Sequence, residues 1–317
     1  MRRVPWRPHD ALHARHSFAG LKACPTYIST RQAWAGNTGP GLFVYDRPVP
    51  APPGPQLATP AVPAVDGHEE QAPPGSTLAT AVAAVRSLIT YAGLAMYVTM
   101  VAPPGMLLAI AFRSKGLLYV LGHLGVRLGL RLSGIEYRVR GREHVPMDRA
   151  VVFCANHQSN IDPPVLFDAL HPRLHILYKA ELSRLPLFGR AIQVGGFIPV
   201  ERQNREQSTA AIARGAASIR AGNSFLIFPE GTRSRTQALL PFKKGGFIMA
   251  LQAQAPIVPV AITGGRAAMR KGSRIIRPVT VSIRIGRSVE TTGLGVADRD
   301  RVIREVRAEI ERLLAES

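Results

Sequence analysis

A histidine and an aspartate five positions apart, His157 and Asp162, carry the side chains that proton transfer requires. Histidine can accept a proton near neutral pH, and a carboxylate at its other ring nitrogen fixes the tautomer and stabilises the imidazolium. The pair follows the apolar run 150–153, which predicts a buried strand that turns into a loop. Open α/β sheets place their chemistry at such strand ends. The pattern predicts a general base, with a surface histidine and a helix-capping aspartate as the alternative interpretation.

Three further segments place polar residues after short apolar strands. They are residues 195–202, which end in Arg202, residues 228–235, which contain Arg233, and residues 257–261. Arginine carries a planar, permanent charge that can bind phosphate through two hydrogen bonds, and Lys179 adds a point charge. Each of these residues alone could be a solvated surface charge. Their shared position at strand ends, with His157, indicates an anion-binding site.

The elements that must position these residues alternate along the chain. Apolar or alternating segments predict strands, and segments with helical periodicity predict helices. The predicted strands are 135–141, 150–155, 174–178, 197–200, 224–228, 257–262 and 279–286, and the predicted helices are 163–170, 205–221, 244–254 and 298–316. This alternation predicts an α/β domain over residues 134–317, with a mostly parallel sheet flanked by helices.

Two segments of different character precede this domain. Residues 1–75 are rich in proline and alanine and lack periodicity, so we expect a disordered tail. Residues 76–133 predict a membrane-associated helical segment. Within it, residues 88–112 contain no charge, and about 20 apolar residues are enough to span a bilayer.

A double proline complicates this apolar run. At Pro103-Pro104-Gly105 we expect either a kinked helix or two short helices that form a hairpin in one leaflet. The next apolar stretch, 116–132, carries Arg127 and Arg131 four positions apart, which suits a helix in the headgroup region. The alternative is a pair of buried core helices.

The charge of the chain favours anionic partners. It has 40 basic and 21 acidic residues, for a formal net charge of +19, which suits phosphate-bearing substrates, acidic lipids or nucleic acid. No heptads, aromatic-interleaved basic strand, Walker loop or dinucleotide glycine pattern is present, so we expect neither nucleic acid nor a cofactor. His171 and His175 flank a proline without a neighbouring glutamate, so no metal site is expected.

Together, the blocks resemble those of the glycerolipid acyltransferases. The matching residues are 156–162, 196–202, 228–234 and 258–260, in the family's order and spacing. The resemblance is greatest to the 1-acyl-sn-glycerol-3-phosphate acyltransferases, and it covers the chain from about Arg86 onward. One departure is Pro199, where the family usually has an aromatic or aliphatic residue. The resemblance implies a glycerol-3-phosphate acyltransferase-like fold.

The resemblance also implies the roles of individual residues. His157 is expected to act as general base, oriented by Asp162, on the free hydroxyl of lysophosphatidic acid. The residues expected to bind the glycerol phosphate are Lys179, Arg202, Glu230, Gly231, Thr232 and Arg233. The hydroxyl oxygen would attack an acyl thioester directly and give phosphatidic acid, because a thioester is already activated.

The implied partners are lysophosphatidic acid, membrane lipids, and acyl-CoA or acyl carrier protein as the acyl donor. The implied location is the bacterial inner membrane, with the site facing the cytoplasm. Two alternatives remain at this point. One is an acyltransferase for glycerol 3-phosphate or another lysolipid, and the other is a basic membrane-binding protein without catalysis.

Overall fold

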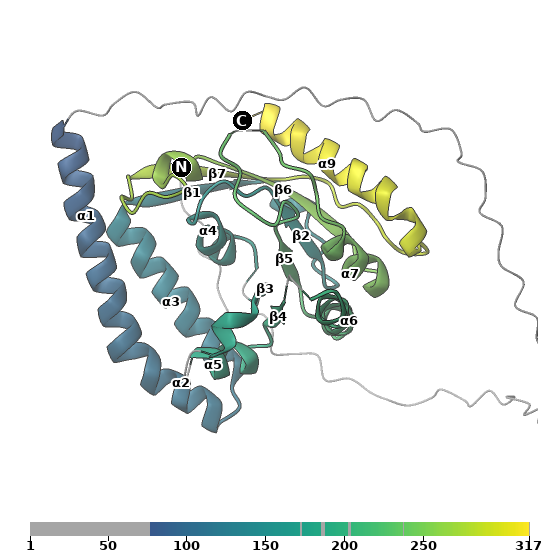
Figure 1. The fold of residues 1–317 in the computed structure, drawn as a ribbon, viewed down its shortest axis with the longest axis horizontal. Helices are drawn as coiled ribbons and strands as arrows, with labels where there is room; N and C mark the ends of the chain where they lie inside the picture. Colours follow the sequence, from purple (N-terminus) through teal and green to yellow (C-terminus); the bar gives the residue numbers. More distant parts are fainter. Residues whose placement is uncertain (1–76, 172, 185–187, 202–203, 237, 317) are drawn as a thin grey trace, which may run out of the picture. The chain divides into compact units, whose positions relative to one another are not determined.

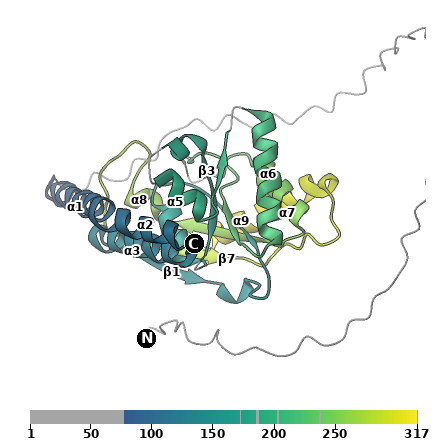
Figure 2. The same ribbon diagram turned by 90° about the horizontal axis from the view of Figure 1, so that it is seen from below.

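The computed structural model describes residues 77–316, apart from 172, 185–187, 202–203 and 237. The predicted tail, residues 1–75, lies outside the described residues. Figures 1 and 2 show the arrangement of the described helices and strands.

A seven-stranded sheet forms the centre of the fold, in the order β1-β7-β6-β2-β5-β3-β4. Its strands are β1 (Ile135–Arg140), β2 (Val152–Ala155), β3 (His175–Lys179), β4 (Ile198–Val200), β5 (Phe225–Ile227), β6 (Ile257–Thr263) and β7 (Val279–Ile285). Only the β6–β7 pair is antiparallel among these strands. The predicted mixed, mostly parallel sheet is confirmed, and β2 is buried on both faces, as strands of parallel sheets usually are.

The two faces of the sheet bury separate apolar clusters. Phe153 of β2 points into the cluster with α3 and α4, whereas its neighbour Val152 points into the cluster with α6, α7 and α9. This division follows from the alternation of side chains along a strand. The helices are α4 (Asp162–Ala169), α5 (Phe188–Val194), α6 (Arg205–Arg220), α7 (Gly245–Ala253), α8 (Gly265–Ala268) and α9 (Arg299–Ala315). The sequence pattern did not predict α5 or α8, which are seven and four residues long.

The apolar segment before the sheet forms a helical hairpin. Helix α1 (Thr77–Met96) continues through a π-helical turn (Tyr97–Val101) into α2 (Ala102–Ala111), and α3 (Lys115–Ser133) returns alongside. Pro103 and Pro104 lie in the first turn of α2, where a missing N–H is tolerated, and the chain stays helical over 35 residues. The hairpin turn therefore comes after the uncharged run, at residues 112–114, and not at the prolines. Close packing depends on glycine, since a Cβ atom at Gly125 would lie 2.8 Å from the Tyr97 ring.

Hydrogen bonds connect the hairpin to the α/β domain. Asp168 of α4 accepts hydrogen bonds from His123 Nδ1 (2.9 Å) and Arg127 Nε (2.9 Å) of α3. It also accepts one from the Tyr137 hydroxyl of β1 (2.8 Å). On α1, the buried Ser87 hydroxyl oxygen accepts a hydrogen bond from the backbone N–H of Ile276 (2.8 Å). The outer face of the hairpin remains apolar and exposed, which contradicts the alternative of two buried core helices.

Candidate active site

The loop after β2 brings His157 and Asp162 together as predicted. Asp162 is the first residue of α4 and is 1% exposed. Its Oδ2 accepts hydrogen bonds from His157 Nδ1 (3.0 Å) and from the backbone N–H groups of Gln158 and Ser159 (2.7 Å each). Because N–H donors converge on this carboxylate, Nδ1 of His157 carries the proton, and Nε2 keeps a lone pair. This is the tautomer that a general base requires.

A second carboxylate holds His157 from behind. Glu230 Oε1 accepts a hydrogen bond from the backbone N–H of His157 (2.8 Å), and Oε2 accepts one from Leu240 N (3.0 Å). Glu230 is 3% exposed, and burial raises its pKa despite these two hydrogen bonds. The structure therefore places Glu230 beneath the loop, where it positions His157, and not among the residues that line the pocket beside His157.

The turn that follows β5 completes the setting of the histidine. The His157 ring stacks on Phe228 with 4.3 Å between centroids. The backbone carbonyl oxygen of His157 accepts a hydrogen bond from Ser234 N (2.8 Å). Both ends of the 228–234 turn thus contact His157, and these contacts limit the motion of the histidine.

The segment after β6 supports the other side of the loop. The buried Asn156 side chain donates to the Ile262 carbonyl oxygen (2.9 Å) and accepts from Ile262 N (2.8 Å). The Ser159 hydroxyl donates to the Met269 carbonyl oxygen (2.7 Å). Gly265, the first residue of α8, packs directly against the Asp162 carboxylate. Sequence reasoning had not assigned a role to residues 262–269, because these contacts join segments about a hundred positions apart.

A pocket of about 500 Å³ opens beside His157. Gly231, Thr232, Arg233 and Lys243 form its polar end, and its other walls are largely apolar side chains from the strands β3, β4 and β5 and from α6. Three of the predicted site residues, Gly231, Thr232 and Arg233, therefore share one pocket with His157. Lys179 is the last residue of β3, and Arg202 lies outside the described residues.

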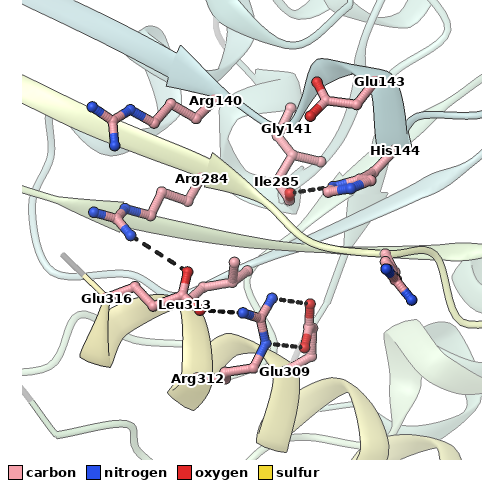
Figure 3. Close-up of a pocket in the computed structure, with 11 residues that line it drawn as sticks. Arg140, Gly141, Glu143, His144, Arg284, Ile285, Glu309, Arg312, Leu313 and Glu316 are labelled. Carbon is pink, nitrogen blue, oxygen red and sulfur yellow. Dashed lines mark hydrogen bonds and ion pairs between the residues drawn. The ribbon is translucent and has the colours of Figure 1, made fainter.

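Two of the other cavities in the described part of the chain differ from this pocket in their lining. One, of about 440 Å³, is almost entirely apolar and lies between the hairpin and Ile161, Pro164 and Phe167. The other, of about 590 Å³, lies between the β1–β7 edge and α9. Figure 3 shows that Arg312 in this cavity is held by Glu309 and Glu316, and that His144 Nδ1 is hydrogen-bonded to the Ile285 carbonyl oxygen at 2.9 Å. Arg284 and Arg312 form ion pairs with Glu309 and Glu316 there, and the cavity contains neither His157 nor the turn after β5.

Comparison with known proteins first shows which protein family and which fold the chain resembles. Residues 136–263 match the family model described as Acyltransferase. The fold is similar to that of the 1-acyl-sn-glycerophosphate (LPA) acyltransferase PlsC from Thermotoga maritima. That likeness has a TM-score of 0.65 and 22% sequence identity, over 74% of this chain and 96% of that chain. It concerns the fold.

Sequence relatives show a more specific similarity, to one kind of acyltransferase. A 1-acyl-sn-glycerol-3-phosphate acyltransferase of Cocos nucifera is 34% identical over 178 residues, which are 56% of this chain and 56% of the relative. The beta form of the human 1-acyl-sn-glycerol-3-phosphate acyltransferase is 33% identical over 166 residues, 52% of this chain and 60% of the relative. The chain thus spans a little more than half the length of these relatives. The resemblance inferred from the four sequence blocks is confirmed.

Proposed function

We propose that this protein transfers an acyl chain from an acyl thioester to the free hydroxyl of lysophosphatidic acid and so forms phosphatidic acid. The observation that carries the proposal is the histidine whose Nδ1 is held by Asp162 in a pocket with one basic end and apolar walls. Such a pocket suits an amphipathic substrate whose hydroxyl lies near a phosphate. The names of the relatives point to the same reaction.

In the proposed reaction, His157 Nε2 takes the proton of the acceptor hydroxyl as its oxygen attacks the thioester carbonyl carbon. A tetrahedral intermediate forms, the carbon–sulfur bond breaks, and the imidazolium returns the proton to the leaving thiolate. Asp162 stabilises the imidazolium and keeps the ring oriented. General acid–base catalysis of this kind contributes about 10²- to 10⁴-fold to a rate. The acyl donor is acyl-CoA or acyl carrier protein.

Charged residues near the pocket are proposed to bind the acceptor's phosphate. Arg233 belongs to the polar end of the pocket, and its Nη1 is buried without a hydrogen-bond partner in the described part of the chain. Gly231 and Thr232 shape the same turn. Lys179 and Arg202 keep the phosphate-binding role that the family resemblance implies. Glu230 contributes indirectly, through the backbone of His157.

The helical hairpin is proposed to bind the bilayer that contains both lipids. Among the described residues, one helix, Thr77–Ala111, is long enough and apolar enough to cross a membrane. Its exposed side includes Leu78, Val82, Leu88 and Met100. Arg113 and Lys115 follow the exposed Phe112 at the hairpin turn, where they would meet anionic headgroups. We place the protein at the bacterial inner membrane with the site facing the cytoplasm, where the donor is made.

The test is thiol release from acyl-CoA by the full chain in detergent or vesicles, with and without lysophosphatidic acid. We expect acceptor-dependent release, phosphatidic acid as the product, and a loss of at least 10²-fold in His157→Ala. Acyl carrier protein is tried as donor in parallel. Absence of release with every lysolipid tested and with glycerol 3-phosphate, from a folded protein that still binds vesicles, would indicate a membrane-binding protein without catalysis.

A further inference from the structure

We infer that Lys243 is a phosphate-binding residue of the His157 pocket, and that it binds the phosphomonoester of the acyl acceptor. The inference rests on the proposed function and adds a residue that lies outside the sequence blocks on which the family resemblance is based. Four observations carry it.

The first observation is that the backbone of Lys243 is hydrogen-bonded to the turn beside His157. The N–H of Lys243 donates to the Pro229 carbonyl oxygen at 2.7 Å. Three residues earlier, Leu240 N donates to Glu230, the same carboxylate that accepts the backbone N–H of His157. The lysine segment and the histidine are therefore both hydrogen-bonded to the same short turn, at Pro229 and Glu230.

The second observation is the course of the lysine side chain. It lies across Gly231, so that a Cβ atom there would be 2.8 Å from Cδ and Cε and 2.9 Å from Nζ. Gly231 has a φ of +67°, which favours glycine, and the missing side chain leaves the space that the lysine occupies. The ammonium group is thus held over the turn that lines the pocket.

The third observation concerns charge. The described residues that line the pocket include Arg233 and Lys243 but no aspartate or glutamate. Within the described part of the chain, Lys243 has no ion pair, whereas its neighbour Lys244 points to α9 and pairs with Asp300 at 3.3 Å. Two cations without a carboxylate at one end of a pocket favour an anionic ligand.

The fourth observation is the start of α7. Gly245 and Gly246 also line the pocket, two and three residues after Lys243, and α7 begins at Gly245. The first backbone N–H groups of a helix have no partner within the helix and carry partial positive charge, which suits phosphate oxygens. Lys243, Arg233 and these N–H groups together match the several oxygens of a phosphomonoester. In lysophosphatidic acid this phosphate is on the carbon next to the one that carries the free hydroxyl.

The test compares two substitutions of Lys243 with one of its neighbour. Lys243→Met keeps the aliphatic stem that packs on Gly231 and removes only the charge, whereas Lys243→Ala removes both. Lys244→Ala is the matched control, because it removes one positive charge from the adjacent, outward-facing position. Each variant of the full chain is assayed for the KM of lysophosphatidic acid, the KM of acyl-CoA, and turnover of a monoacylglycerol that lacks the phosphate.

We expect Lys243→Met and Lys243→Ala to raise the KM of lysophosphatidic acid about 10- to 100-fold, the usual effect of losing a hydrogen bond to a charged group. The preference for lysophosphatidic acid over monoacylglycerol should fall by the same factor. The KM of acyl-CoA should stay within about twofold, and Lys244→Ala should behave like the wild type.

Several results would overturn the inference. A rise in the KM of acyl-CoA alone would assign Lys243 to a phosphate of the donor. Equal effects of Lys243→Met and Lys244→Ala would reduce the role to general charge, and a defect in Lys243→Ala that Lys243→Met lacks would reduce it to packing on Gly231. Failure of the wild type to use any acceptor would instead reject the proposed function. Normal wild-type turnover with unchanged Lys243 variants would reject only the assignment of Lys243.

Discussion

The carboxylate of Asp162 packs against the α-carbon of Gly265, so closely that a methyl group at Gly265 would overlap Oδ1. No side chain larger than hydrogen fits there without movement of the carboxylate that orients His157. The β6–α8 connection therefore constrains the proposed catalytic pair, His157 and Asp162, without containing a reactive group.

Gly265→Ala should displace Asp162 and lower kcat on the order of 10²-fold, because small misplacements of catalytic groups have effects of that size. The KM of lysophosphatidic acid should change little, since Gly265 does not line the pocket of His157. Gly116→Ala is the matched control, because a Cβ atom at Gly116 meets nothing within 4 Å. An unchanged kcat in Gly265→Ala would show that the loop adapts and that the contact is not needed.

Asp162→Asn should lower kcat by about 10²- to 10⁴-fold. An amide cannot stabilise the imidazolium, and its NH₂ group would face N–H donors that now converge on a carboxylate oxygen. Steady-state thiol release at saturating acceptor measures the effect. Residual activity close to that of the wild type would remove Asp162 from the mechanism.

Asp168→Asn should destabilise the protein by about 1–3 kcal/mol, because His123, Arg127 and Tyr137 would lose a buried carboxylate. Burial alone would raise the pKa of Asp168, but the hydrogen bonds from His123, Tyr137 and Arg127 outweigh it and lower the pKa. This stabilisation is therefore present above the unfolded-state pKa of 3.8 and is lost as the pH falls through the folded-state value. Thermal unfolding at pH 7 and pH 3 measures both effects. Asp300→Asn on the exposed face of α9 is the control and should leave the unfolding midpoint nearly unchanged.

His175 should make the fold sensitive to mild acid. It is 2% exposed among Tyr119, Phe197 and Phe225, and burial lowers its pKa from 6.5. The folded state then binds fewer protons than the unfolded state, so this contribution to stability is complete above pH 6.5 and falls as the pH drops below it. Unfolding midpoints at pH 7.5 and pH 5.5 should differ less in His175→Gln than in the wild type. Identical pH dependence in the two proteins would contradict this assignment.

Strand positions and the His157–Asp162 pair could be predicted from the sequence, because short apolar runs such as 150–155 are typical of strands buried on both faces, and polar residues directly after them lie at the carboxyl end of the sheet. The position of the hairpin turn could not be predicted from the sequence, since Pro103 and Pro104 are compatible with both a helix break and the first turn of a helix. In the sequence, Glu230 stands among polar residues, which suggests an exposed side chain that binds substrate. Only the fold shows that its two oxygens accept hydrogen bonds from backbone N–H groups. Similarly, nothing in Lys243-Lys244 indicates which lysine faces the pocket.

The two oxygens of Glu230 have a consequence for acceptor choice. One oxygen holds the backbone of the histidine and the other holds the segment that leads to Lys243. Glu230 is therefore one of the contacts, with the Ser234–His157 and Lys243–Pro229 hydrogen bonds, that fix the spacing between His157 and the charged end of the pocket. Under the proposed function, this spacing matches a hydroxyl and a phosphate on neighbouring carbons, so acceptors in which the two groups are one carbon further apart should be poorer substrates.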